Sequence, residues 1–183
     1  RVTMVDYEWS DLIDRQDKVR MLSDPTNPYA TNAAWAMGRA IDDELFSGMN
    51  GTAYTGVDGT GTSSFPSAQK VAVASSGLTL AKLLSAKEIM DTNDVDPDMM
   101  SYILYRPKDR TTLLNTTEVK NSDYNTVKAL VNGQIDTFMG FKFVKSNRLK
   151  INGNVRDCIV MEKQGMLLAV NEEFDVDVGP RRD

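Results

Sequence analysis

Apolar residues recur at helical spacing in several stretches of the chain. Residues 7–22 predict an amphipathic helix, because their apolar positions fall on one side with acidic and basic residues between them. Residues 27–48 predict a longer helix, which starts after the cap and first-turn proline of Asp24-Pro25 and ends at Gly48. We expect the inward side of this long helix to be one stripe: Tyr29, Ala33, Met37, Ala40, Ile41 and Leu45.

The pattern of the second half mixes helices with short strands. Leucines and isoleucine at residues 80–90 predict a helix, and Val127 to Ile135 predict another that starts at Asp123. Apolar runs and alternation predict strands at residues 102–105, 141–144, 157–170 (two strands that turn at Gln164-Gly165) and 174–178. The sequence therefore predicts an α+β fold.

Three residues are expected to set sharp turns between these elements. Pro107 and Asp109 follow the strand at 102–105 and turn the chain directly into a helix that continues to Leu114. Gly140 separates the helix that begins at Asp123 from the strand at 141–144. A further stretch, residues 48–61, holds five of the 12 glycines and predicts a loop or hairpin tip, which is the best candidate boundary in the chain.

Composition excludes several classes of enzyme. The 183 residues contain no histidine, which excludes histidine-activated nucleophiles and histidine-ligated metal sites. Cys158 is the single cysteine, so an internal disulfide and a cysteine-rich zinc site are excluded. Since Cys158 stands beside Ile159 and Val160, we interpret it as a buried apolar residue and not as a nucleophile.

Charge and hydropathy limit the partners of the chain. The net charge is -5, so the chain as a whole repels polyanions, and general binding of nucleic acid is not expected. No apolar run approaches the roughly 20 residues that span a bilayer, so we expect no membrane contact. The first residue, Arg1, favours a trimmed product or a fragment of a longer protein.

Short motifs of catalytic or ligand-binding chemistry are incomplete. The carboxylates from Asp91 to Asp98 lack the glycine and glutamate that a calcium loop requires, and we interpret them as a solvated loop. Residues 67–70 match Ser-x-x-Lys, but the companion motifs of serine acyl transferases are missing. Residues 59–64 lack the third glycine of a dinucleotide loop. We therefore expect no catalytic residue, no cofactor-binding residue, no metal ligand and no cofactor.

Two charged groups leave alternatives open. The carboxylate pairs Asp42-Asp43 and Glu172-Glu173 could serve acid and base chemistry, but adjacent residues point apart and nothing selects a partner. The basic cluster, with Phe141 and Phe143 interleaved, could bind single-stranded nucleic acid by stacking, although an alternating strand would turn both rings to the core. The cluster consists of Lys142, Lys145, Arg148, Lys150 and Arg156.

The order of elements resembles that of tailed-phage major capsid proteins. Residues 78–114 resemble the strand, turn and helix of that family through the segment SYILYRPKD at 101–109. IDTFMGFKFV at 135–144 resembles the glycine and aromatic segment that follows it in the family. MGRAIDD at 37–43 and SDYNTVKALVNG at 122–133 resemble stretches of one branch of these proteins.

This resemblance implies the Hong Kong ninety-seven fold, in which residues 27–48 would be the spine helix of a peripheral domain. Residues 1–66 would be part of that domain, including the glycine-rich connection. Residues 67–171 would be the axial domain, with a mixed sheet flanked by helices, and residues 172–183 would return to the peripheral domain. Family members also carry an N-terminal arm, an extended loop and a C-terminal end that find no match here, which again favours a fragment.

The function that the resemblance implies is structural. Copies of the chain would assemble into the hexamers and pentamers of an icosahedral shell that encloses double-stranded DNA, in a virion assembled in the cytoplasm of a host bacterium. Partners would be the chain itself, scaffold, portal and decoration proteins, and DNA only through weak non-specific contact, with no membrane partner. The alternatives are another virion or adaptor-type binding protein, or a carboxylate-dependent hydrolase with two facing acids.

Overall fold

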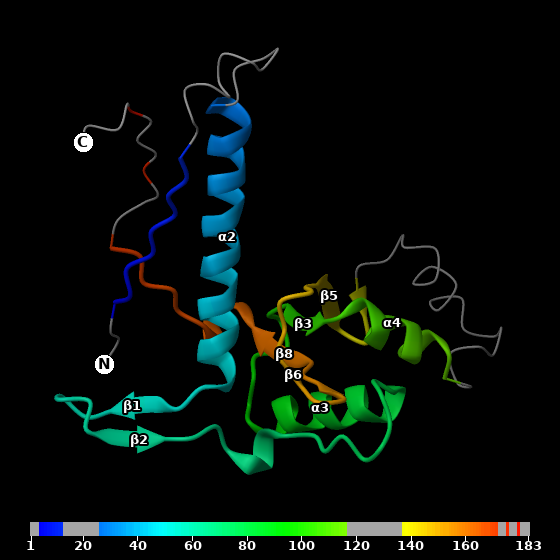
Figure 1. Cartoon of the computed structure of the whole chain (residues 1–183). Helices are drawn as coiled ribbons and strands as arrows, with labels where there is room; N and C mark the ends of the chain where they lie inside the picture. Colours follow the sequence, from blue (N-terminus) through cyan, green and yellow to red (C-terminus); the bar gives the residue numbers. More distant parts are fainter. Residues whose placement is uncertain (1–3, 13–25, 117–136, 172–174, 176–178, 180–183) are drawn as a thin grey trace.

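Helices and short strands are mixed along the chain in an α+β arrangement (Figure 1). The computed structural model describes residues 4–12, 26–116, 137–171, 175 and 179. Within these residues a long helix, α2, and a two-stranded hairpin precede a four-stranded sheet that is covered by α3 and α4. We call this sheet, with α3 and α4, the sheet unit.

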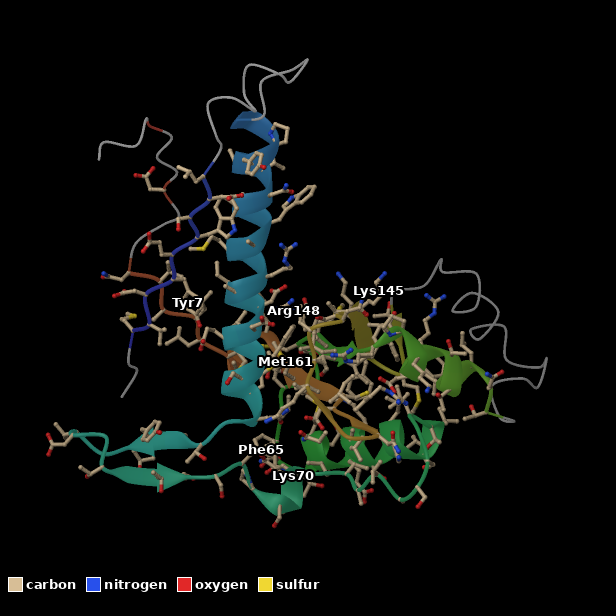
Figure 2. All side chains as sticks on the ribbon, in the orientation of Figure 1. Tyr7, Phe65, Lys70, Lys145, Arg148 and Met161 are labelled. Carbon is tan, nitrogen blue, oxygen red and sulfur yellow. The ribbon has the colours of Figure 1, made fainter. Side chains whose placement is uncertain are left out.

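Helix α2 spans Thr26–Asn50 and extends away from the sheet unit as a single rod (Figure 1). Its 25 residues correspond to about 37 Å of helix. The helix expected at 27–48 is therefore confirmed and is slightly longer at both ends. A segment before it, residues 4–12, runs beside α2 without helical structure, and the Tyr7 hydroxyl donates a hydrogen bond to the Glu44 carboxylate (Figure 2).

The glycine-rich connection after α2 forms a hairpin. Strand β1 (Ala53–Thr55) pairs antiparallel with β2 (Gly61–Ser63), and every residue of the two strands is exposed. A Cβ on Gly61 would lie 2.5 Å from Oγ1 of Thr55 and 3.2 Å from its carbonyl oxygen, so any other residue there would force Thr55 of the neighbouring strand to shift. The expected loop or hairpin tip is confirmed as a hairpin, which projects sideways in Figure 1.

The four-stranded sheet has the order β4-β5-β3-β8. Its central pair, β3 and β5, is parallel, while β8 on β3 and β4 on β5 are antiparallel. A second small hairpin, β6 with β7, lies between β5 and β8 in the chain. The bounds are β3 Ser101–Tyr105, β4 Thr137–Phe138, β5 Phe141–Lys145, β6 Ile151–Asn152, β7 Val155–Arg156 and β8 Ile159–Glu162, with 3-10 turns at Ser67–Gln69 and Lys163–Gly165.

A two-residue turn at Met139 and Gly140 joins β4 to β5. Both residues have positive φ, +54° and +81°, as the two central residues of a type I′ turn do. Glycine adopts this conformation without steric cost, which explains why Gly140 follows the short strand β4. Strand β5 begins directly after it at Phe141.

The core of the sheet unit lies between the sheet and its two helices. Leu83 of α3 (Leu80–Thr92) and Leu113 of α4 (Pro107–Leu114) are fully buried. They join Leu78, Ile103 of β3 and Phe141 of β5 in one apolar cluster. Since Ile103 and Phe141 point to the same side of adjacent strands, both helices cover that side.

The loop before α3 is held by charge and by close packing. The Lys82 ammonium donates to the carbonyl oxygens of Val73, Ser76 and Gly77 at 2.6, 2.6 and 2.9 Å. A Cβ on Gly77 would lie 2.5 Å from Cγ2 of Thr112, so glycine lets α4 pack directly on this loop. The helix N-terminus of α3 is thereby fixed against α4.

Most strand and helix predictions in the sheet unit are confirmed, namely α3, β3, α4, β5 and the first strand after residue 157. The helix expected from Tyr7 is wrong over residues 7–12, where the chain lies beside α2 and the apolar side chains remain exposed. The second strand after Gln164-Gly165 is also wrong over residues 166–171, which leave the sheet toward α2, with Cε of Met166 3.9 Å from a Cβ placed on Gly48. The rest of the helix at 7–22, the helix from Asp123 and most of the strand at 174–178 fall outside the described residues.

Candidate functional site

The start of α4 is the most strongly organised polar site in the described chain. Pro107 occupies the first helical turn, where its missing N–H group costs no hydrogen bond. The Asp109 carboxylate accepts a hydrogen bond from the backbone N–H of Arg106 at 3.3 Å, so it caps the helix that it belongs to. Strand β3 can therefore turn into α4 without any intervening loop.

Asp109 also carries a buried ion pair. It is 2% exposed, and its second carboxylate oxygen accepts from Nε of Arg156 at 2.8 Å. Arg156 ends β7, so this pair joins the start of α4 to the small β6–β7 hairpin. Burying a carboxylate costs free energy unless it is paired and hydrogen-bonded. The helix cap and the ion pair therefore both help to offset the cost of burying Asp109.

Arg106 strengthens the same junction through a backbone acceptor. Its guanidinium donates from Nε to the carbonyl oxygen of Leu149 at 2.8 Å, and Nη2 of the same side chain donates to this oxygen too. Leu149 is fully buried beside this contact. The two arginines and Asp109 thus fix the segment 149–156 against the turn between β3 and α4; we call this group the Asp109 cluster.

Cys158 lies next to the Asp109 cluster. Burial, together with the charge of the Asp109 carboxylate and a hydrogen bond with it, raises the pKa of its thiol to about 12. The side chain is therefore a neutral thiol at physiological pH, and a neutral thiol is a poor nucleophile. The thiol also packs against the apolar cluster of the sheet unit, together with Val160.

An open hollow of about 400 Å³ lies over this junction. Its walls come from the first turn of α4 and from the β6–β7 hairpin. Most of its polar side chains are cationic. The lining residues are Arg106, Pro107, Lys108, Ile151, Gly153, Asn154 and Arg156.

A second polar contact joins α2 to the sheet unit. The Arg148 guanidinium, in the loop after β5, donates from Nε to Oδ1 of Asp43 at 2.7 Å, and its Nη2 donates to the other carboxylate oxygen. Figure 2 shows Arg148 at the point where α2 passes the sheet unit. Asn50, at the end of α2, donates to Asp157 at 3.4 Å and adds a weaker contact on the same side.

The α2 contact predicts a dependence on pH. The hydrogen bond from Arg148, with its charge as a smaller contribution, holds the pKa of Asp43 below its ordinary value of 3.8. A lowered folded pKa means that the stabilisation is complete above the unfolded pKa and is lost as the pH falls through the folded pKa. We expect the stability difference between the wild type and Asp43→Asn to be present at pH 7 and to vanish near pH 2. An NMR titration that places the pKa of Asp43 at 3.8 or above would contradict this.

The comparison with protein families decides the identity of the chain. A family model described as phage capsid protein matches residues 1–183, which is the whole sequence. The chain belongs to the phage capsid protein family. Searches of the curated proteins and of the solved structures each give no match.

For a phage capsid protein, a structural function of the Asp109 cluster is the natural interpretation, because this family is structural and not enzymatic. No group of three or more acidic or cysteine side chains in the described ranges is arranged to hold a metal ion. The carboxylates from Asp91, in the last turn of α3, to Asp98 belong to those ranges. Among the described helices, none has the length and apolar character needed to cross a membrane.

The six residues expected to form the inner stripe of the long helix differ in how far they are exposed to solvent. Ala33 is buried, whereas Ile41 is 42% exposed. The remaining four are half-buried: Tyr29, Met37, Ala40 and Leu45. That these six residues form one inward stripe of the helix stays a prediction.

The arginines of the site were not found as site residues from the sequence. Arg148 and Arg156 were grouped only as members of a basic cluster, and the structure gives each of them a different acidic partner. The partners are 105 and 47 residues away in the chain. No local signal in the sequence connects residues at such separations.

Proposed function

We propose that this phage capsid protein is the major subunit of an icosahedral head with the Hong Kong ninety-seven fold. Helix α2 would be the spine helix, residues 1–66 part of the peripheral domain, residues 67–171 the axial domain, and residues 172–183 the return to the peripheral domain. Copies would form hexamers and pentamers around double-stranded DNA. Assembly would take place in the cytoplasm of the host bacterium, with scaffold, portal and decoration proteins as further partners.

One observation supports assembly most directly: the described chain leaves much of its large apolar surface uncovered. Nineteen large apolar side chains are exposed, against nine buried hydrophobic residues in the core. Most of the exposed ones lie outside the sheet unit, on residues 4–12, on α2, on the β1–β2 hairpin and on residues 167–170. Apolar surface of this extent is typical of a protein that buries it against partners.

The shape of the molecule supports the same proposal. The β1–β2 hairpin is exposed on all its residues, and an isolated two-stranded hairpin is only marginally stable in water. Val57 at its tip is 97% exposed. Contacts with neighbouring copies would cover these surfaces, and repeated contacts of one kind close into a symmetric assembly when the rotation between neighbours allows it.

The net charge suits a container for DNA. The chain carries 26 acidic and 21 basic residues, which disfavours tight phosphate contacts along the inner wall. We therefore expect DNA to be held by enclosure and only weakly by contact. Strong, salt-sensitive binding of duplex DNA by assembled shells would contradict this part of the proposal.

The proposal predicts that an exposed tryptophan of α2 is needed for assembly but not for folding. Trp35 is 62% exposed in the single chain, so Trp35→Asp should change the free energy of unfolding by less than about 0.5 kcal/mol. Sedimentation velocity and negative-stain microscopy should show shells or capsomers for the wild type and mainly monomers for Trp35→Asp. Trp35→Phe, which keeps an apolar ring, should assemble.

This experiment uses the full-length gene product, expressed alone and together with the neighbouring scaffold gene. Shells, capsomers or tubes should appear over a range of salt concentrations. If the wild type stays monomeric under all of these conditions, the proposal is overturned. Equal assembly of Trp35→Asp and wild type would remove α2 from the interface.

A further inference from the structure

The hollow at the start of α4 carries an excess of positive charge. Three cations line it, Arg106, Lys108 and Arg156, and Asp109 balances one of them through its pair with Arg156. Arg106 donates to a neutral carbonyl, so its charge is not compensated by that contact. Lys108 is exposed and forms no ion pair with any described residue.

A loop of opposite charge lies elsewhere on the same chain. Between Asn93 and Met100 the acidic residues are Asp94, Asp96 and Asp98, with no basic residue among them. All three are exposed, and none forms an ion pair with a described residue. We call residues 93–100 the acidic loop.

The acidic loop has a fixed shape. The backbone N–H of Val95 donates to the carbonyl oxygen of Met90, and that of Met99 to the carbonyl oxygen of Asp96, both at 3.2 Å. The Asp96 carboxylate accepts from the N–H of Asp98 at 3.0 Å. A loop that is ordered by its own hydrogen bonds loses little conformational entropy when it binds.

The topology separates the loop from the hollow within one subunit. The acidic loop leads into the first residue of β3, whereas Arg106 and Lys108 follow its last residue. Five residues of strand separate the two by roughly 16 Å. The connection from α3 and the start of α4 indeed lie at opposite ends of β3 in Figure 1.

We propose that the hollow at the start of α4 binds the acidic loop of a second copy of this chain. This inference rests on the proposed assembly function and names one of its contacts. Two different surfaces at opposite ends of one strand make a head-to-tail contact, and such contacts close into rings when the rotation between neighbours allows it. Complementary charge would set the orientation and register of neighbouring subunits.

A second copy is favoured over nucleic acid as the occupant for a reason of charge. DNA carries about one negative charge per 1.7 Å of duplex, so the field of a chain with a net charge of -5 repels it far more strongly than it repels a second copy, whose net charge is also -5. The acidic loop brings its carboxylates in a compact group, and every subunit supplies one loop for every hollow. Binding of DNA to the hollow is kept as an outcome of the test.

Charge reversal tests the pairing. We expect Lys108→Glu and Asp98→Lys, each alone, to raise the protein concentration needed for capsomer formation by about tenfold at low salt. The double variant should return to within about threefold of the wild type. Lys145→Glu, the same change at an exposed lysine at the end of β5, is the matched control and should assemble normally.

Mixing the two single variants separates contacts between subunits from contacts within one. In an alternating ring, the new carboxylate in the hollow of Lys108→Glu meets the new ammonium in the loop of Asp98→Lys, and the unchanged hollow meets the unchanged loop. An equal mixture should therefore assemble at lower concentration than either variant alone. An effect within one chain would be rescued by the double variant but not by the mixture, and this result would overturn the proposal.

The remaining outcomes distinguish a failure of the proposed function from a failure of this inference. A wild type that forms no oligomer overturns the proposed function itself, whereas normal assembly of Lys108→Glu overturns only this inference. Fluorescence anisotropy with a labelled 20-base-pair duplex tests the other occupant. Binding by the wild type that is lost in Lys108→Glu would assign the hollow to nucleic acid and overturn the pairing.

Discussion

Replacing Asp109 by alanine is expected to lower the free energy of unfolding by about 3 to 5 kcal/mol, because it removes one partner of a buried ion pair. The Arg156 side chain, 20% exposed, would keep its charge without a carboxylate. The backbone N–H of Arg106 would lose its acceptor at the start of α4 as well. Urea denaturation followed by circular dichroism measures the loss, since the two tryptophans of the chain are exposed and report poorly on the core.

Two further variants separate the causes of this loss. Asp109→Asn keeps an acceptor for the helix cap but removes the charge, so it should be intermediate in stability. Asp91→Asn breaks an exposed pair with Lys87 four residues away and should cost less than about 0.5 kcal/mol. If Asp109→Ala lies within about 1 kcal/mol of the wild type, the pair contributes no more than it costs to bury.

Asp109 shows which features of the site can be predicted from the sequence and which cannot. Its place in a turn followed from local signals: a strand, a proline and an acidic residue in the first turn of a helix. Its partner Arg156 depends on how β7 is placed against α4, which is a tertiary property. The same limit explains why Asp43 was seen only as one member of an acidic pair on α2, although it is the residue that holds Arg148.

The incorrect predictions have a common physical origin. Apolar periodicity was assumed to point to a face buried within the chain, as it does for α3 around Leu83. Trp9 and Leu12 share that periodicity but are 40% and 65% exposed on a non-helical segment beside α2. In a subunit that is built to contact its neighbours, apolar side chains serve two purposes, and the pattern in one sequence does not separate them.

The rings of β5 are a case in which the alternating pattern correctly predicted that the aromatic side chains turn to the core. Phe141 is fully buried in the apolar cluster, and Phe143 packs edge to face against Tyr105 with a centroid distance of 5.5 Å. Phe141 is therefore not accessible to a base. The alternative of a stacking surface for single-stranded nucleic acid loses one of its two rings. The lysines of β5 therefore lack the Phe141 ring as a stacking partner, which a surface for single-stranded nucleic acid would combine with its cations.

Phe141→Ala is therefore expected to act on stability and not on binding. Removing a fully buried ring leaves a cavity beneath α3 and α4 and should lower the free energy of unfolding by about 3 to 5 kcal/mol. Val144→Ala, at a position 37% exposed on the other side of the same strand, should cost less than about 1 kcal/mol. Urea denaturation of both variants measures the difference, and anisotropy with a labelled single-stranded oligonucleotide gives the second readout. Unchanged stability of Phe141→Ala together with lost oligonucleotide binding would show that the ring is a stacking platform, because a core residue cannot be removed without cost.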